Sequence, residues 1–128
     1  MKVNLENLSN IKTEFFLATN SFCFDLKTET EKFVLWIHPI WRIIKDKKVI
    51  HSSFSCPVYD NYEDENEYEL EFKKWCKKTN YLKKHKIIKF QITEINDLKL
   101  TWKDGSSLET FKYDEEEEEN WYIQNQEN

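Results

Sequence analysis

The sequence contains very little glycine and proline, with one Gly and two Pro among 128 residues. Phosphate-binding loops of the Walker and dinucleotide-binding types need several glycines, because glycine lets the backbone curl closely around a phosphate. The single glycine, Gly105, cannot build such a loop. The enzyme classes that depend on these loops are therefore excluded.

Long apolar runs are absent as well. No stretch approaches the roughly 20 apolar residues that a transmembrane helix needs, and 34% of the residues are charged. The first ten residues also lack the apolar core of a secretory signal. We therefore expect a protein that works in the cytoplasm and has no membrane partner.

Cysteine is sparse and irregularly spaced. Cys23, Cys56 and Cys76 are an odd number, whereas a disulfide framework usually shows more cysteines in an even count. No C-x-x-C or H-x-x-x-H pair provides the spacing of a structural zinc site. We expect three free thiols, as in a reducing compartment, and no metal or other cofactor.

Catalytic signatures are also missing. His51 is followed by Ser52 and Ser53, but no nucleophile elbow surrounds these serines. Cys56 precedes Pro57 in a segment without periodicity, where a lone thiol is usually inert. We therefore expect that the protein is not an enzyme. The alternative is a small enzyme or ligand-binding domain with a pocket between sheet and helix, which a deep polar pocket there would favour.

What the sequence does have is aromatic residues, at 16%, arranged in alternating stretches. Alternation of apolar and polar residues predicts half-buried β-strands. Such strands fill 11–51 and 87–123, which we interpret as two β-meanders, and 124–128 is expected to be a frayed tail. Residues 33–37 are apolar at every position, which is typical of a strand covered on both faces. The Asp-Gly pair at 104–105 predicts a tight hairpin turn.

One segment, 67–82, carries the repeat of an amphipathic helix. Its inward-facing residues follow a 3.6-residue period, and they are Tyr68, Phe72, Trp75, Cys76, Thr79 and Leu82. The expected fold is a single α+β domain over residues 1–128, with an antiparallel β-sheet built from two β-meanders and one amphipathic helix packed on it. The two meanders resemble each other in the order of their strands and turns, and this repetition favours a curved or two-layer sheet.

The net charge is −5, but the charges are separated along the chain. Acidic residues fill 60–71 and 114–119, and lysines are concentrated in 73–89. Acidic residues in the first turns of the predicted helix and lysines in its later turns suit the helix dipole and can form surface ion pairs. We therefore interpret the lysines as part of a solvated face. The alternative is that they contact phosphates, with Trp75 or Tyr81 as stacking platforms. The acidic balance disfavours this direct binding of nucleic acid.

The acidic run at 114–119 has two interpretations. It is either a solubilising loop or a carboxylate surface that imitates a nucleic-acid backbone and attracts the basic cleft of a partner. The aromatic residues beside it would then anchor the interface, and a second acidic patch precedes the helix. The candidate partner-binding residues are Asp114, Glu115, Glu116, Glu117, Glu118, Glu119, Trp121, Tyr122, Glu63, Asp64 and Glu65.

The C-terminal part resembles the end of a family of small bacterial proteins of unknown function. In that family a D-L-x-L-x-F-x-D-G-x-x-L core leads to a terminal E-x-W. The first half is also similar to the family's opening, through the triplet Trp41-Arg42-Ile43, and the resemblance covers about 5–50 and 87–123. The middle helix and the acidic run depart from it. The residues that carry the C-terminal resemblance are Asp97, Leu98, Leu100, Trp102, Asp104, Gly105, Leu108 and Asn120-Trp121.

Proteins of this kind are often encoded beside polymorphic toxins, and many of them act as immunity proteins. The resemblance implies that this chain binds and neutralises a bacterial toxin effector domain, such as a nuclease with a basic cleft. A second hypothesis is a phage-encoded inhibitor of a host defence protein. Both hypotheses describe a protein that works by binding another protein.

Overall fold

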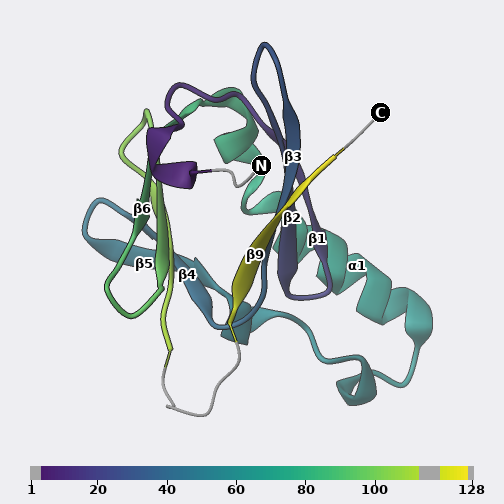
Figure 1. The fold of residues 1–128 in the computed structure, drawn as a ribbon. Helices are drawn as coiled ribbons and strands as arrows, with labels where there is room; N and C mark the ends of the chain where they lie inside the picture. Colours follow the sequence, from purple (N-terminus) through teal and green to yellow (C-terminus); the bar gives the residue numbers. More distant parts are fainter. Residues whose placement is uncertain (1–3, 113–118, 127–128) are drawn as a thin grey trace.

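The computed structural model describes residues 4–112 and 119–126. These residues form two antiparallel β-sheets and one main α-helix, so the predicted α+β class is confirmed (Figure 1). The first sheet has the order β1-β2-β3-β9, with β1 at Glu14–Ala18, β2 at Ser21–Lys27, β3 at Lys32–Ile37 and β9 at Trp121–Asn125. The second has the order β5-β4-β8-β7-β6, with β4 at Trp41–Lys45, β5 at Lys48–Ser52, β6 at Ile87–Ile92, β7 at Leu98–Trp102 and β8 at Ser107–Thr110.

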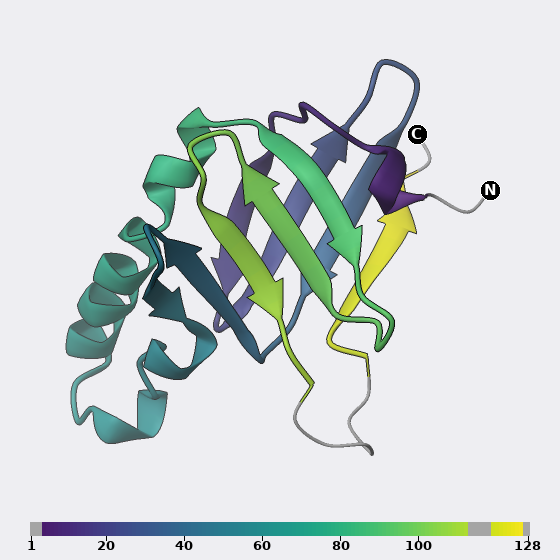
Figure 2. The same cartoon turned by 90° about the vertical axis from the view of Figure 1, so that its left-hand side faces the viewer.

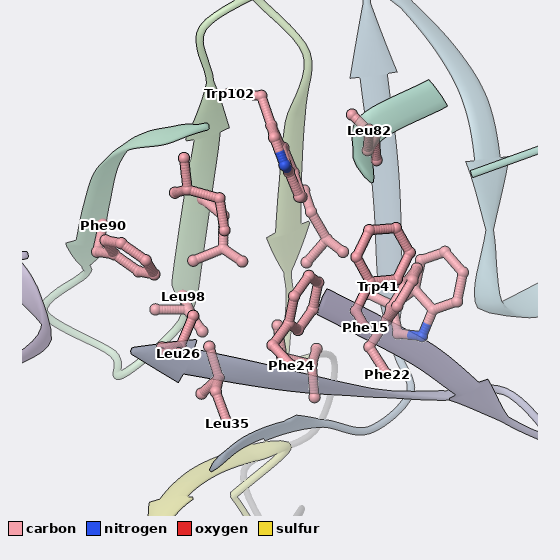
Figure 3. Packing of buried hydrophobic residues seen from close by; sticks show 14 of the residues in the cluster. Phe15, Phe22, Phe24, Leu26, Leu35, Trp41, Leu82, Phe90, Leu98 and Trp102 are labelled. Carbon is pink, nitrogen blue, oxygen red and sulfur yellow. The ribbon is translucent and has the colours of Figure 1, made fainter. Parts of the chain in front are cut away.

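The two sheets face each other and enclose the core (Figures 1 and 2). Phe24 of β2 meets Trp102 of β7, with ring centroids 6.2 Å apart, and Phe22 meets Trp41 of β4 at 4.6 Å (Figure 3). All four side chains are fully buried. Each buried aromatic ring removes a large apolar area from water, so these contacts between the sheets account for much of the stability of the fold.

Each sheet contains strands from both halves of the sequence, because the first includes β9 and the second includes β4 and β5. β9 pairs with β3, and β4 pairs with β8. The predicted meanders at 11–51 and 87–123 therefore contain the right hairpins, but neither forms a sheet by itself. The chain changes sheets at Pro39, between β3 and β4, where proline cannot donate to a strand ladder. Apolar alternation fixes which face of a strand is buried, but it does not fix which strand lies beside it.

The hairpin turns between β2 and β3, β4 and β5, and β7 and β8 lie where the sequence predicts them. In the β7–β8 turn, Gly105 has φ +92°, and the Asp104 carboxylate accepts a hydrogen bond from the Ser106 N–H at 3.0 Å. In the β4–β5 turn, Asp46 and Lys47 take φ of 52° and 65°. Positive φ at both central residues matches the right-handed twist of the flanking strands.

The main helix, α1, spans Glu65–Lys77 and is followed by a 3₁₀ turn, η4, at Asn80–Lys84. The sequence predicts one helix over 67–82. α1 begins earlier because Asp64 caps it, with Oδ1 accepting a hydrogen bond from the Asn66 N–H at 2.9 Å. No helix in the described segments is both long enough and apolar enough to cross a membrane. Shorter 3₁₀ turns are η1 at Leu5–Asn7, η2 at Ser53–Ser55 and η3 at Tyr59–Asn61.

α1 lies along the side of the two sheets, next to β1 and β5, rather than across a sheet face (Figure 2). Its one fully inserted side chain is Trp75, which is 4% exposed. The Trp75 ring centroid is 6.0 Å from that of Trp41, and its Nε1–H donates to Ser55 Oγ at 2.9 Å. Leu82 of η4 is also buried. The helix is therefore attached to the core by an aromatic anchor near its C-terminal end.

His51 lies inside this attachment. Its ring centroid is 4.7 Å from that of Trp75 and 5.8 Å from that of Trp41, and its side chain is buried. Nε2 has no hydrogen-bond partner among the described residues. Burial, together with the positive charge of Lys78, lowers the pKa of His51 from 6.5 to about 4. The neutral imidazole is therefore the form that fits between the two tryptophans.

The lowered pKa of His51 predicts a pH-dependent stability. Protonation favours the unfolded chain, so the contribution of neutral His51 is complete above pH 6.5 and is lost as the pH falls towards 4. The wild type should lose up to about 3 kcal/mol more than His51→Gln over this interval. Chemical denaturation at a series of pH values measures the difference, and parallel stability curves for the two proteins would contradict it.

Two phenylalanines of the first sheet provide a matched test of the core. Phe22 is 0% exposed, whereas Phe16 is 54% exposed on the other face of the same sheet. Phe22→Ala should lower the free energy of unfolding by about 3–5 kcal/mol, because it leaves a cavity between the sheets. Phe16→Ala should cost less than about 1 kcal/mol. Equal costs, measured by urea denaturation, would show that the core lies elsewhere.

Candidate protein-binding surface

The outer face of the β1-β2-β3-β9 sheet carries a continuous row of side chains, which we call the aromatic row. Strand register places Phe16 of β1 opposite Cys23 of β2, Cys23 opposite Trp36 of β3, and Trp36 opposite Tyr122 of β9. Successive residues of a strand point to opposite faces. The neighbours of these four residues therefore point into the core, and the row itself points away from it.

The rings of the aromatic row touch one another and a neighbouring histidine. The Phe16 and Trp36 centroids are 6.1 Å apart in an edge-to-face arrangement, so the two rings meet over the smaller Cys23. His38 stacks on Trp36 at 5.9 Å and lies 5.7 Å from Tyr122. Each side chain thus limits the freedom of the next, and the row presents a preorganised surface.

Much of this surface is open to solvent. Phe16 is 54% and Tyr122 is 39% exposed, and Trp36 and His38 are half-buried. The sequence predicts a strand covered on both faces at 33–37. In the structure the core covers one face of β3, and on the other face Val34 is buried while Trp36 is half-buried. Aromatic side chains grouped on an open face mark protein interaction sites.

Most of the long acidic run lies outside the described residues. The five residues concerned are Asp114, Glu115, Glu116, Glu117 and Glu118. Glu119 is described and exposed, and its Oε1 accepts a hydrogen bond from Asn96 Nδ2 at 3.3 Å. The contribution of this run to partner binding stays a prediction.

The two predicted aromatic anchors point to opposite faces of β9. Tyr122 belongs to the aromatic row, as an anchor should. Trp121 is half-buried against the core, and its Nε1–H donates to the Asn96 carbonyl at 2.8 Å. Trp121 therefore fastens β9 to the turn before β7, so Tyr122 is the member of the pair that faces outwards.

The second predicted patch lies at the start of α1. Glu63, Asp64 and Glu65 are all exposed there, and Asp64 is occupied as the helix cap. This end of α1 projects beyond the β1 side of the first sheet, whereas β9 forms the opposite edge (Figures 1 and 2). The structure therefore does not bring this patch next to Trp121 and Tyr122.

Sequence reasoning missed Phe16, Trp36 and His38 as surface residues. The apolar residues on both faces of 33–37 are a signal for Trp36, but such a pattern equally predicts a strand that is buried on both sides. Phe54, Val58, Tyr59 and Leu70 form other exposed apolar positions, and they lie on the short turns before α1 and on the helix itself. The aromatic row differs from these in that neighbouring strands hold its members in register.

The hydrogen-bonded cluster at the β7–β8 turn is structural. Asp104 Oδ2 lies 3.4 Å from Lys45 Nζ and 3.8 Å from His85 Nε2, and it accepts a hydrogen bond from Ser106 Oγ at 3.0 Å. Burial alone would raise the pKa of Asp104, but the hydrogen bonds from Ser106 and Lys45 and the nearby His85 outweigh it and lower the pKa. Ser106 is fully buried and cannot reach a substrate, so this network fastens the turn.

The cysteines offer no activated nucleophile among the described residues. Burial, followed by the influence of Cys76, raises the pKa of Cys56 to about 11, and burial also raises the pKa of Cys76 itself. Because the thiolate is the reactive form, both thiols are poor nucleophiles near neutral pH. The described residues also contain no group of three His, Cys, Asp or Glu side chains that could hold a metal ion.

The hollow between sheet and helix is small. It measures about 170 Å³ and lies between β1 and the end of α1. Its lining brings together no pair of acidic or imidazole groups, and consists of Phe15, Phe16, Leu17, Cys76, Thr79, Asn80 and Lys83. This hollow gives the alternative of a ligand-binding or enzymatic pocket little support.

Comparison of the chain with protein-family models, with curated proteins and with solved structures found no match.

Phe16 and Trp36 meet over Cys23, and the cover that they provide for its thiol can be tested. Cys23 is 6% exposed, and burial, followed by the nearby charge of Asp25, raises the pKa of its thiol. Phe16→Ala should uncover this thiol and speed its alkylation several-fold, whereas Tyr122→Ala, two strands away, should leave the rate unchanged. Mass spectrometry of the peptide that contains Cys23 measures both rates. Equal rates in the two variants would mean that Phe16 does not cover the thiol.

Proposed function

We propose that this chain is an immunity-type protein that binds and neutralises a bacterial toxin domain, and that the toxin docks on the outer face of the β1-β2-β3-β9 sheet. The observation that carries the proposal is the aromatic row, which lies on an open face of a sheet whose core is complete without it. An occupant of this face would bury Phe16, Trp36 and Tyr122 at no cost to the core.

The rigidity of the row supports a role in binding. Aromatic side chains have few rotatable bonds, so they lose little conformational entropy when a partner covers them. The ring contacts between Phe16 and Trp36, and the stacking of His38 on Trp36, restrict these bonds further. Interfaces obtain most of their binding energy from a few such anchors near the centre.

The charge of the protein supports a basic partner. The net charge is −5, and exposed carboxylates of Glu14 and Asp25 share the face with the aromatic row. Glu119 is exposed just before β9. Because the same face also carries the exposed Lys27 and Lys32, it is the net negative charge of the whole chain that favours the approach of a positively charged surface and speeds association. A toxin domain that binds nucleic acid has a basic surface of this kind.

Neutralisation requires only that the bound protein cover the toxin's active site or the surface around it. It requires no reaction on this chain, in keeping with the raised thiol pKa values and the buried position of Ser106.

Co-expression provides the test. A bacterial host that produces the toxin domain encoded beside this gene should grow when the wild-type chain is present. The double variant Trp36→Ala, Tyr122→Ala should lose this protection and bind the purified toxin at least about 30-fold more weakly, since an interface anchor contributes about 2 kcal/mol or more. Growth assays and calorimetric titration measure the two effects.

Val49→Ala with Ile50→Ala is the matched control. These residues are 57% and 41% exposed on β5, in the other sheet, so the variant removes exposed apolar area away from the aromatic row. It should protect as well as the wild type. Failure of the wild type to protect against the neighbouring toxin would contradict the proposed function. Full protection by the Trp36 and Tyr122 variant would contradict the docking face.

A further inference from the structure

Two carboxylates lie next to the aromatic row on the same face of the first sheet. Glu14 of β1 is directly opposite Asp25 of β2, and both are exposed. Neither takes part in an ion pair among the described residues. Like charges directly opposite each other weaken a strand pair, so this position carries an electrostatic cost that a cation from outside would remove.

The carboxylate pair stands close to the rings. Glu14 precedes Phe16 by two residues and Asp25 follows Cys23 by two, so the pair lies about 7 Å along the strands from the aromatic row. After burial, the charge of Asp25 is the second cause of the raised pKa of Cys23, in line with this closeness. A group placed between the two rows would meet carboxylates on one side and the rings of Phe16 and Trp36 on the other.

The lysines of the chain itself leave this position open. Lys27 and Lys32 are opposite each other in the next row of the same face, beyond Asp25. Both are exposed, yet neither forms an ion pair with Glu14 or Asp25. The face therefore presents a cationic row, an anionic row and the aromatic row in succession along the strands.

A guanidinium group suits a surface that combines carboxylates with aromatic rings better than an ammonium group does. Guanidinium is planar and weakly hydrated, and it stacks on aromatic rings while its N–H groups donate to carboxylates. Its five donors can serve two carboxylates at once. An ammonium group is a compact, strongly hydrated charge, which gains less from the rings.

We propose that the surface formed by Glu14, Asp25, Phe16 and Trp36 is an arginine-recognition site, which takes the guanidinium group of an arginine presented by a protein partner. The inference rests on the proposed function in taking a protein as the source of that arginine. It adds the chemistry by which the partner is selected, since a surface rich in lysine but without arginine would bind less well.

A hexa-arginine peptide and a hexa-lysine peptide are the probes. Titration of the ¹⁵N-labelled full chain with hexa-arginine should shift the amide signals of Glu14, Phe16, Asp25 and Trp36. Hexa-lysine should bind several-fold more weakly. Trp36→Val, which keeps a strand-forming residue but removes the ring, should abolish most of this preference for arginine.

The double variant Glu14→Gln, Asp25→Asn should bind hexa-arginine at least five-fold more weakly than Glu67→Gln, Glu69→Gln. The second variant changes the net charge equally on the exposed side of α1, so it controls for general attraction. Both variants should still unfold cooperatively on heating, and the Glu14 and Asp25 variant should be at least as stable as the wild type because it removes the repulsion within the pair. Equal affinities of the two variants would overturn the site. Signal shifts confined to Glu119 and its neighbours, or equal binding of the two peptides, would also overturn it.

Failure of this inference is separate from failure of the proposed function. If the wild type protects against the toxin but the Glu14 and Asp25 variant binds hexa-arginine normally, the arginine site is wrong and the immunity function stands. If hexa-arginine binds at the site but the wild type gives no protection, the site stands and the immunity function is wrong.

Discussion

The fold depends on the contact between the aromatic inner faces of two β-sheets. Phe22 and Phe24 of the first sheet meet Trp41 and Trp102 of the second, and all four are fully buried. Because β9 and β4 each pair with strands from the other half of the chain, the two halves fold around this one core. The Trp75 anchor then attaches α1 to the same cluster of rings through Trp41 and His51.

A complete inner core leaves the outer face of the first sheet free for another purpose. β3 shows this division clearly, since Leu35 and Ile37 are fully buried while Trp36 between them faces away from the core. Both faces share one strand register, so the packing of the inner side chains in the core also fixes the positions of the outer side chains. A strand that is apolar on both faces can therefore serve the core with one face while an aromatic side chain on the other face stays partly exposed.

The local elements were predictable, because each depends on residues close together in sequence. The Asp-Gly turn at 104–105 and the helical repeat of 67–82 are examples. The turn lies where it is predicted, and the helix spans Glu65–Lys77 with a 3₁₀ turn at Asn80–Lys84. The pairing of β9 with β3 was not predictable, since it joins strands far apart in sequence and alternation carries no information about neighbours. Whether the outer face of β3 is covered is also decided by tertiary packing. The apolar run at 33–37 alone therefore predicts a covered strand, although Trp36 is only half-buried.

The candidate site was predictable only in part. Strand alternation implies that Trp121 and Tyr122 cannot face the same way, and only tertiary packing decides that Tyr122 is the exposed one. Glu14 and Phe16 lie far from Trp36 and Tyr122 in sequence, and they come together only because β1 and β9 flank β2 and β3 in one sheet. A surface assembled from four strands leaves no compact motif in the sequence.

Hydroxyl-radical footprinting of the chain, free and mixed with the proposed toxin partner, would show whether the aromatic row is the docking face. The labelling rates of Phe16, Trp36 and Tyr122 should fall together on binding, whereas those of Phe54 and Val49, which are exposed elsewhere, should not change. Protection of Phe54 or Val49 with unchanged labelling of the aromatic row would contradict docking on the outer face of the first sheet.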